Sequence, residues 1–273
     1  MILCDIHTHS DNSFDAKSSV DAMCAAAVKA GLSVLAVTDH CEAEYIRCGE
    51  DCEFGSFDRQ IPKSISDIRA AQKKYKGKLK LLCGLELGEP MHDPEQTKQA
   101  LVYGDFDFVL ASVHNLRGRD DFYYMDFKTV DVGEILREYF DELAETAAFP
   151  HFDSLSHLTY PLRYIVEREG YYPELAPFEG QIEKIFNILI KNKKALEINV
   201  SGLFKPIGRT LPDLRLVKKF REMGGEYITL GTDAHSADMV GKGIIEGVAV
   251  AKQAGFSHYT IFENHRPVLI EIE

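Results

Sequence analysis

The segment Ile2-Leu3-Cys4-Asp5-Ile6-His7-Thr8-His9 joins a run of β-type residues to two metal-binding side chains, and this combination recurs along the chain. A strand rises about 3.3 Å per residue, so one strand alone cannot assemble a metal site. In a barrel of parallel strands, every strand brings its last residue to the same rim, where catalytic groups gather. Six further segments end in the same way: Thr38-Asp39-His40, Gly84-Leu85-Glu86, Ser112-Val113-His114, Leu155-Ser156-His157, Glu197-Ile198-Asn199 and Gly231-Thr232-Asp233-Ala234-His235.

The order of the predicted elements favours a parallel sheet, because strands alternate with helices. A doubly wound open sheet fits this order equally well, but it gathers its site at one switch point. Here nearly every strand end contributes, so we predict an α/β fold: a distorted TIM-like barrel of about seven strands in one domain, residues 1–273. Strands are predicted at residues 2–6, 33–37, 79–83, 108–111, 152–155, 195–200 and 227–230, and helices at 19–31 (N-cap Ser19, Gly31 at its end), 132–148, 181–193 and 214–223.

Composition narrows the function classes. The 43 acidic residues outnumber the 31 basic ones, giving a net charge of -12, which argues against a nucleic-acid partner. The charged Asp5 comes too early for a signal peptide, and no apolar run has the length of a membrane span. The six cysteines are therefore expected to be free thiols in the cytoplasm. Cys41, Cys48 and Cys52 match no iron-sulfur spacing and indicate a cysteine-containing loop; residues 41–62 are predicted to form a long loop that could cover the site.

The histidines are distributed unevenly. His7 and His9 lie two residues apart in an extended segment, so both imidazoles face the same side and can reach one cation. Imidazole and carboxylate groups are suitable ligands for zinc, manganese or iron. Glu86 and Asp233 also follow β-type runs. Six of the ten histidines do the same: His7, His9, His40, His114, His157 and His235. The other four, His92, His151, His258 and His265, are expected to be solvated or structural.

These motifs together resemble those of the polymerase and histidinol phosphatase (PHP) family and, within it, the monofunctional histidinol-phosphatases. The resemblance runs from His7 to His235 and implies two to three divalent transition metals. The resemblance assigns the first metal to His7, His9, Glu86 and Asp233, the second to Glu86, His114 and His157, and the third to Asp15, His40 and His235. Asp11 lies near Asp15 and is the alternative carboxylate ligand for the third metal.

Three further polar residues lie beside these segments. We expect Asp39 to orient a ligand histidine without coordinating a metal itself. Glu197 and Asn199 either act in the same way or merely end a strand. Glu42, Glu44, Tyr123 and Tyr124 are candidates for recognising an imidazole and an ammonium group of the substrate.

Adjacent metals suit hydrolysis of a phosphate ester, because they acidify a bridging water and neutralise phosphoryl oxygens. The expected nucleophile is therefore hydroxide bridging the metals, and the chain carries no serine-hydrolase elbow, P-loop or cysteine-phosphatase signature. The resemblance makes Arg163 and Arg209 the expected phosphate clamp, with Lys205 as a third candidate. Asp233, His235 or a metal-bound water could protonate the leaving alkoxide.

The resemblance implies hydrolysis of L-histidinol phosphate to L-histidinol and phosphate in histidine biosynthesis. Another small phosphomonoester or phosphotyrosine remains an alternative substrate. An amidohydrolase also opens with His-x-His, but it usually bridges its metals from the fourth strand, whereas Glu86 ends the third predicted strand. A nuclease module fits the acidic charge poorly, and a non-catalytic metal-binding module would need no phosphate clamp. A homo-oligomer is left open, and no membrane partner is expected.

Overall fold

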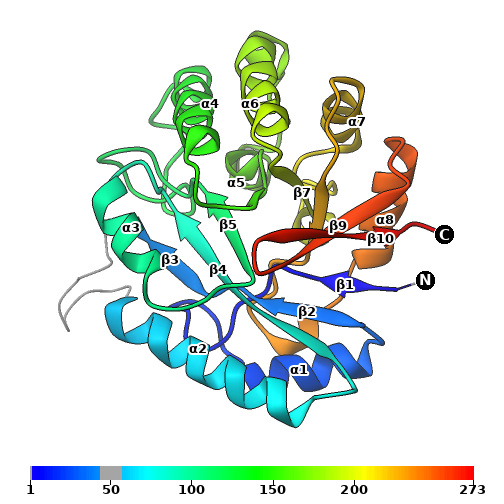
Figure 1. Ribbon diagram of the computed structural model, residues 1–273. Helices are drawn as coiled ribbons and strands as arrows, with labels where there is room; N and C mark the ends of the chain where they lie inside the picture. The colour runs from blue at the N-terminus through cyan, green and yellow to red at the C-terminus, as the bar shows by residue number, and fades with distance from the viewer. Residues whose placement is uncertain (1, 44–56) are drawn as a thin grey trace.

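The computed structural model describes residues 2–43 and 57–273, and within them parallel strands form a nearly closed ring (Figure 1). The ring closes between its first and last strands, where Ile6 N donates to Leu230 O at 3.1 Å and Asp233 N donates to His7 O at 2.8 Å. The predicted distorted barrel is therefore confirmed. The order around the ring is β1 (Cys4–Asp5), β2 (Val34–Val37), β4 (Lys80–Gly88), β5 (Phe108–Ser112), β6 (Ser154–Leu155), β7 (Ala195–Asn199) and β8 (Ile228–Gly231).

The strands are buried on both faces, as expected for parallel strands covered by helices. Every residue of β2, β5 and β7 is buried. Polar side chains inside the ring pair with each other: Ser154 Oγ on β6 lies 2.8 Å from Thr229 Oγ1 on β8. The interior is therefore a packed core rather than a channel, and chemistry is restricted to an end of the barrel.

Helices surround the strands in Figure 1, and their ends follow the capping signals of the sequence. Ser19 caps the first helix as predicted, since its Oγ accepts a hydrogen bond from Ala22 N at 3.3 Å. The predicted helix at residues 132–148 matches α4. The helices are α1 (Val20–Lys29), α2 (Phe57–Lys74), α3 (Pro94–Leu101), α4 (Val132–Ala148), α5 (Tyr160–Glu169), α6 (Glu179–Lys191), α7 (Leu214–Glu222) and α8 (Ile244–Gln253).

The predicted loop at residues 41–62 is wrong at both of its ends. β3 (His40–Glu42) pairs with the second half of β4, with His40 opposite Glu86. These added backbone hydrogen bonds extend β4 to Gly88, so Glu86 lies within its strand and not after it. At the other end, α2 starts at Phe57 and includes Pro62, because its apolar face packs into the core. Glu44, Cys48, Cys52 and the proposed cover of the site lie outside the described residues.

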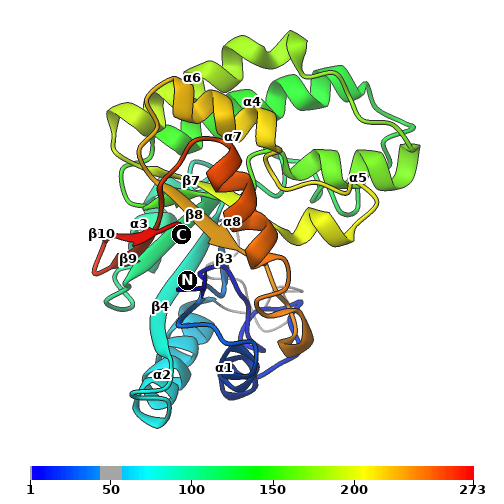
Figure 2. The same ribbon diagram turned by 90° about the vertical axis from the view of Figure 1, so that its right-hand side faces the viewer.

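A hairpin of β9 (His258–Glu263) and β10 (Arg266–Glu271) crosses the end of the barrel where the strands begin (Figures 1 and 2). Its contacts are with residues that precede or start strands: Tyr259 Oη donates to Ile2 O at 2.5 Å, and His265 Nδ1 lies 2.9 Å from Asp153 Oδ2. The hairpin closes this end, so the opposite rim remains for a functional site. No described helix is long and apolar enough to cross a membrane.

Candidate metal centre

Four predicted ligands meet at the rim where the strands end. His7 Nε2 and His9 Nε2 are 3.1 Å apart, and Glu86 Oε2 lies 3.2 Å from the first and 3.4 Å from the second. Asp233 Oδ1 completes the group, 3.4 Å from His9 Nε2. A tetrahedral zinc ion with ligands at about 2.0–2.1 Å separates its ligand atoms by roughly 3.4 Å. The group therefore has the dimensions of a site for one cation.

The other oxygen of Glu86 faces a second group. Glu86 Oε1 lies 3.0 Å from His157 Nε2 and 3.4 Å from His114 Nε2, and the two imidazole nitrogens are 3.4 Å apart. Glu86 thus stands between two groups, as a bridging ligand would. Its Oε2 is buried and has no hydrogen-bond partner among the described residues. A buried carboxylate oxygen without a donor is costly, and a cation shared with the surrounding imidazoles would satisfy it.

The third predicted group lies on the more open side. His235 Nε2 is 3.0 Å from Asp15 Oδ2, and His40 Nε2 is 3.8 Å from Asp15 Oδ1. Nitrogens of His9, His40 and His235 come within 4.8 Å of one another. Asp11 and Asp15 are both exposed, but of the two only the Asp15 side chain contacts these histidines in the described structure. Asp15 is therefore the carboxylate that the structure places with these histidines.

The carboxylates and imidazoles of the centre shift each other's pKa strongly. Burial alone would raise the pKa of Glu86, but the imidazoles of His7, His40 and His114 hold it well below its usual value. Burial, with the neighbouring His40 and His235, lowers the pKa of His9 to about 3. Burial alone would also lower the pKa of His7, His40, His114 and His235, but neighbouring carboxylates outweigh it and raise the pKa of all four. Metal ligation requires ionised carboxylates and neutral imidazoles, so these four histidines would release protons when a metal binds.

Two carboxylates contact the far side of ligand histidines. His7 Nδ1 lies 2.7 Å from Glu197 Oε1, and His114 Nδ1 lies 3.3 Å from Glu42 Oε1. Such contacts fix the tautomer and leave Nε2 for a cation. Glu42 Oε1 is also 3.1 Å from His40 Nδ1, so this residue lies inside the centre. Its place two residues after His40, on the same side of a strand, is the signal that could have indicated this role.

Gly231 makes the approach of β1 to β7 and β8 possible. A Cβ atom at this position would lie 2.3 Å from His7 Cβ and 2.5 Å from Glu197 Oε1. Real Cβ atoms do not come so close to other heavy atoms. The contact between His7 and Glu197 therefore requires glycine here.

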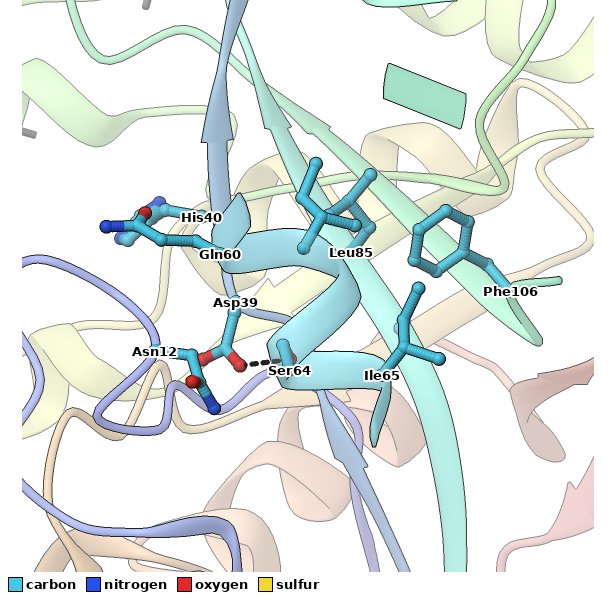
Figure 3. Close-up of a pocket in the computed structure, with 10 residues that line it drawn as sticks. Asn12, Asp39, His40, Gln60, Ser64, Ile65, Leu85 and Phe106 are labelled. Atoms are coloured by element: carbon cyan, nitrogen blue, oxygen red, sulfur yellow. Dashed lines mark hydrogen bonds between the residues drawn. The ribbon is translucent and has the colours of Figure 1, made fainter. Parts of the chain in front are cut away.

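The expectation for Asp39 needs correction, because in the described part of the chain no hydrogen bond joins its side chain to an imidazole. Next to a ligand histidine on the same extended segment, it faces the opposite side and reaches serines instead. Its closest link to a ligand is Ser13, whose Oγ lies 3.5 Å from His9 Nδ1. Figure 3 shows the bond to Ser64 beside a small pocket that also includes Asn12 and Gln60. Asp39 accepts hydrogen bonds from Ser10 N (2.6 Å), Ser10 Oγ (2.8 Å), Ser13 Oγ (3.0 Å) and Ser64 Oγ (2.5 Å).

Arg163 on α5 brings a largely buried positive charge to the ligand cluster, with 11% of its side chain exposed. Its Nη1 lies 3.4 Å from Asp233 Oδ2, and its guanidinium stacks over the rings of Tyr160 and Tyr164 at 4.7 and 5.0 Å. Its Nη2 donates to Tyr164 Oη at 2.9 Å. Its Nε finds no hydrogen-bond partner among the described residues, although it is buried. An oxyanion would satisfy this donor.

The other two basic candidates make contacts away from the ligands. Arg209 is half-exposed, with Nη1 3.6 Å from Asp213 Oδ2 and its guanidinium 4.3 Å from the ring of Tyr172. Lys205 is exposed at the end of the short 3₁₀ helix Ser201–Phe204. Tyr123 and Tyr124 are also exposed. Roles for these residues in substrate binding stay predictions.

The sequence reading overlooked Glu89 and Ser201. Glu89 is buried, has a left-handed backbone (φ 48°), and accepts a hydrogen bond from His114 N. Burial, with the nearby Glu42 charge, raises its pKa well above the usual value. Ser201 accepts a hydrogen bond from Arg163 Nη1 at 3.2 Å. Neither belongs to a recognisable motif, because each depends on partners distant in sequence.

Comparison with known proteins gives consistent results. The PHP domain matches residues 5–201. A probable histidinol-phosphatase of Thermotoga maritima is 29% identical over 95% of both chains, and a histidinol-phosphatase of Lactococcus lactis is 29% identical over 94% of this chain and 93% of that one. A crystal structure of histidinol phosphate phosphatase from L. lactis, complexed with zinc, L-histidinol and phosphate, superimposes with a TM-score of 0.80 at 27% identity, covering 97% and 98% of the two chains.

Proposed function

Because the chain belongs to the PHP family, we propose that it hydrolyses a phosphate monoester, with L-histidinol phosphate as the substrate and L-histidinol and phosphate as the products. The named relatives and the L. lactis complex support this substrate. The observation that carries the proposal is Arg163, whose Nη1 lies 3.4 Å from Asp233 Oδ2 at the ligand cluster and whose buried Nε has no hydrogen-bond partner among the described residues. A phosphoryl dianion needs such a planar, permanently charged donor next to its metal ions.

The donor set suits two to three divalent ions of zinc, manganese or iron. When bound, such ions acidify a water and neutralise charge on phosphoryl oxygens. The residues that would hold them are His7, His9, Glu86 and Asp233 for the first, Glu86, His114 and His157 for the second, and Asp15, His40 and His235 for the third.

The chain's own groups contribute binding and proton transfer. Arg163 would bind phosphoryl oxygens and hold them next to Asp233. The alkoxide of the departing alcohol needs a proton, and Asp233 and His235 are the side chains considered for this step. His235 is the more accessible of the two, with 31% of its side chain exposed against 7% for Asp233. We propose His235 as the proton donor only in a state in which its imidazole is protonated and does not ligate the third metal ion.

Cys4, Cys24, Cys41 and Cys83 are buried free thiols, and free thiols suit the reducing cytoplasm proposed for this protein.

A substrate panel on metal-analysed protein tests the proposal. We expect two to three metal ions per chain by elemental analysis, rapid phosphate release from L-histidinol phosphate, loss of activity on chelation, and recovery when zinc, manganese or iron is returned. A preference for phosphotyrosine or another phosphomonoester would keep the chemistry and change the substrate. Full metal occupancy without phosphatase activity would refute the function, and full activity with one ion or none would refute the three-metal centre.

A further inference from the structure

Three buried polar residues at alternate positions, two at the end of β7 and one just after it, connect the metal centre to Arg163. We propose that Glu197, Asn199 and Ser201 form a positioning chain between His7 and Arg163, in which the Ser201 hydroxyl holds the guanidinium in its phosphate-binding orientation. This inference rests on the proposed function, because it assumes that Arg163 binds the phosphoryl group. In this proposal none of the three residues contacts the substrate, and they act by positioning His7 and Arg163.

Glu197 is the first link, and both of its oxygens are committed. Oε1 lies 2.7 Å from His7 Nδ1, while Oε2 accepts hydrogen bonds from His157 N at 2.8 Å and from Asn199 Nδ2 at 3.2 Å. Only 1% of the Glu197 surface is exposed. The carboxylate therefore contacts two ligand histidines, His7 and His157, and also accepts a hydrogen bond from Asn199.

The orientation of Asn199 follows from its neighbours. Ser201 N donates to the side-chain oxygen of Asn199 at 3.1 Å, and a backbone N–H can only face an acceptor. The amide nitrogen of Asn199 must then point toward Glu197, as observed. Ser201 Oγ donates its one hydrogen to the same Asn199 oxygen at 2.6 Å. Its lone pairs remain for Arg163 Nη1, which lies 3.2 Å away.

The chain thus gives Ser201 a defined polarity. A hydroxyl that could rotate freely would offer Arg163 either its hydrogen or its lone pairs, but here only lone pairs face the cation. Ser201 on one side and Tyr164 Oη on the other fix the two ends of the guanidinium fork, and Nε is left without a partner. Without Ser201, the acceptor left to Nη1 among the described residues would be Asp233, at 3.4 Å. The guanidinium would then be free to turn toward that carboxylate.

A double-mutant cycle on the metal-loaded enzyme tests the proposal. We expect Ser201→Ala to lower kcat/KM for L-histidinol phosphate by about five- to twentyfold with metal content unchanged, since one hydrogen bond to a charged group is lost. In the Arg163→Ala background the same change should have no further effect. Ser201→Thr, which keeps the hydroxyl, should recover most of the activity.

Ser154→Ala is the matched control, because it also removes a buried hydroxyl, whose hydrogen bond in the described structure is to Thr229 inside the barrel. We expect it to lower thermal stability without changing kcat/KM. Calorimetric binding of inorganic phosphate repeats the cycle without turnover. If the wild type hydrolyses no phosphomonoester but the phosphate-binding cycle is non-additive, the proposed function fails and the positioning chain stands. An equal loss in both Arg163 backgrounds, or no loss from Ser201→Ala, would overturn the inference.

Discussion

The two ends of the barrel use the same residue types with different results. At the end closed by the hairpin, two carboxylates find backbone donors: Asp107 accepts from Cys83 N at 2.9 Å, and Asp153 accepts from Val109 N at 2.9 Å. At the other rim, Glu86 Oε2 is buried without a hydrogen-bond partner in the described structure. Other rim carboxylates do accept from the backbone, as Glu197 accepts from His157 N at 2.8 Å. Glu86 Oε2 is the exception among the described rim carboxylates, and a bound cation would supply its missing partner.

The largest expected effect separates the two ends directly. Glu86→Gln keeps the shape but removes the negative charge placed between two ligand groups. We expect metal occupancy to fall and kcat/KM to drop by more than about a hundredfold. This exceeds the roughly 10- to 100-fold loss that follows mutation of residues hydrogen-bonded to metal ligands. Glu263→Gln is the control at the hairpin end, where it removes a surface ion pair with Lys80. Elemental analysis and turnover measure both; a fully loaded, fully active Glu86→Gln enzyme would contradict a bridging role.

The second prediction concerns the arginines of the rim. Charge-assisted hydrogen bonds contribute roughly 1.5–3 kcal/mol each, and every 1.36 kcal/mol is about tenfold in rate. Arg163→Ala should therefore lower kcat/KM by about ten- to a hundredfold with metal content unchanged, and Arg163→Lys should recover only part of it. Arg209 is half-exposed and bound to Asp213, so Arg209→Ala should cost less. An equal loss in both variants would show that Arg209 reorients when substrate binds.

The third prediction tests the carboxylate behind His114. Glu42→Gln should weaken metal binding by roughly tenfold, the lower end of the range for such partners, because glutamine retains one acceptor oxygen. Glu142→Gln is a matched control, since Glu142 Oε2 lies 2.7 Å from the nitrogen of His92 in a similar pair outside the centre. Competition with a zinc chelator gives both affinities. A Glu42→Gln enzyme with unchanged zinc affinity would reduce this residue to a packing role.

The smallest effect is expected at the hairpin end. The hydrogen bond to Asp153 raises the pKa of His265. A raised pKa in the folded state stabilises the protein fully below the unfolded value of about 6.5 and is lost as pH rises through the folded value. Because His265 is half-exposed, His265→Ala should cost less than about 1 kcal/mol at pH 6 and almost nothing at pH 9. Urea unfolding at both pH values measures this; an equal loss at both would mean that the charge contributes nothing.

The sequence predicted what is local. Ligands such as His7 and His114 follow β-type runs, so the strand rule alone brings them to one rim. β3 escaped prediction because its three residues form a strand only when β4 is beside them. Glu197 was left undecided because its partner His7 is 190 residues away, and nothing in a local pattern reports such a contact. Ser201 escaped for the same reason, as Arg163 lies 38 residues earlier.

The missing side chain at Gly231 also limits how this centre can be copied. The space that a side chain at position 231 would need is already occupied by His7 of the closing strand and by the Glu197 carboxylate that contacts it. Grafting the histidines and acids onto another barrel would reproduce the ligands without the close approach that aims them. A protein engineer would have to transplant the seam of three strands as one unit, with its glycine, before a single metal-binding side chain.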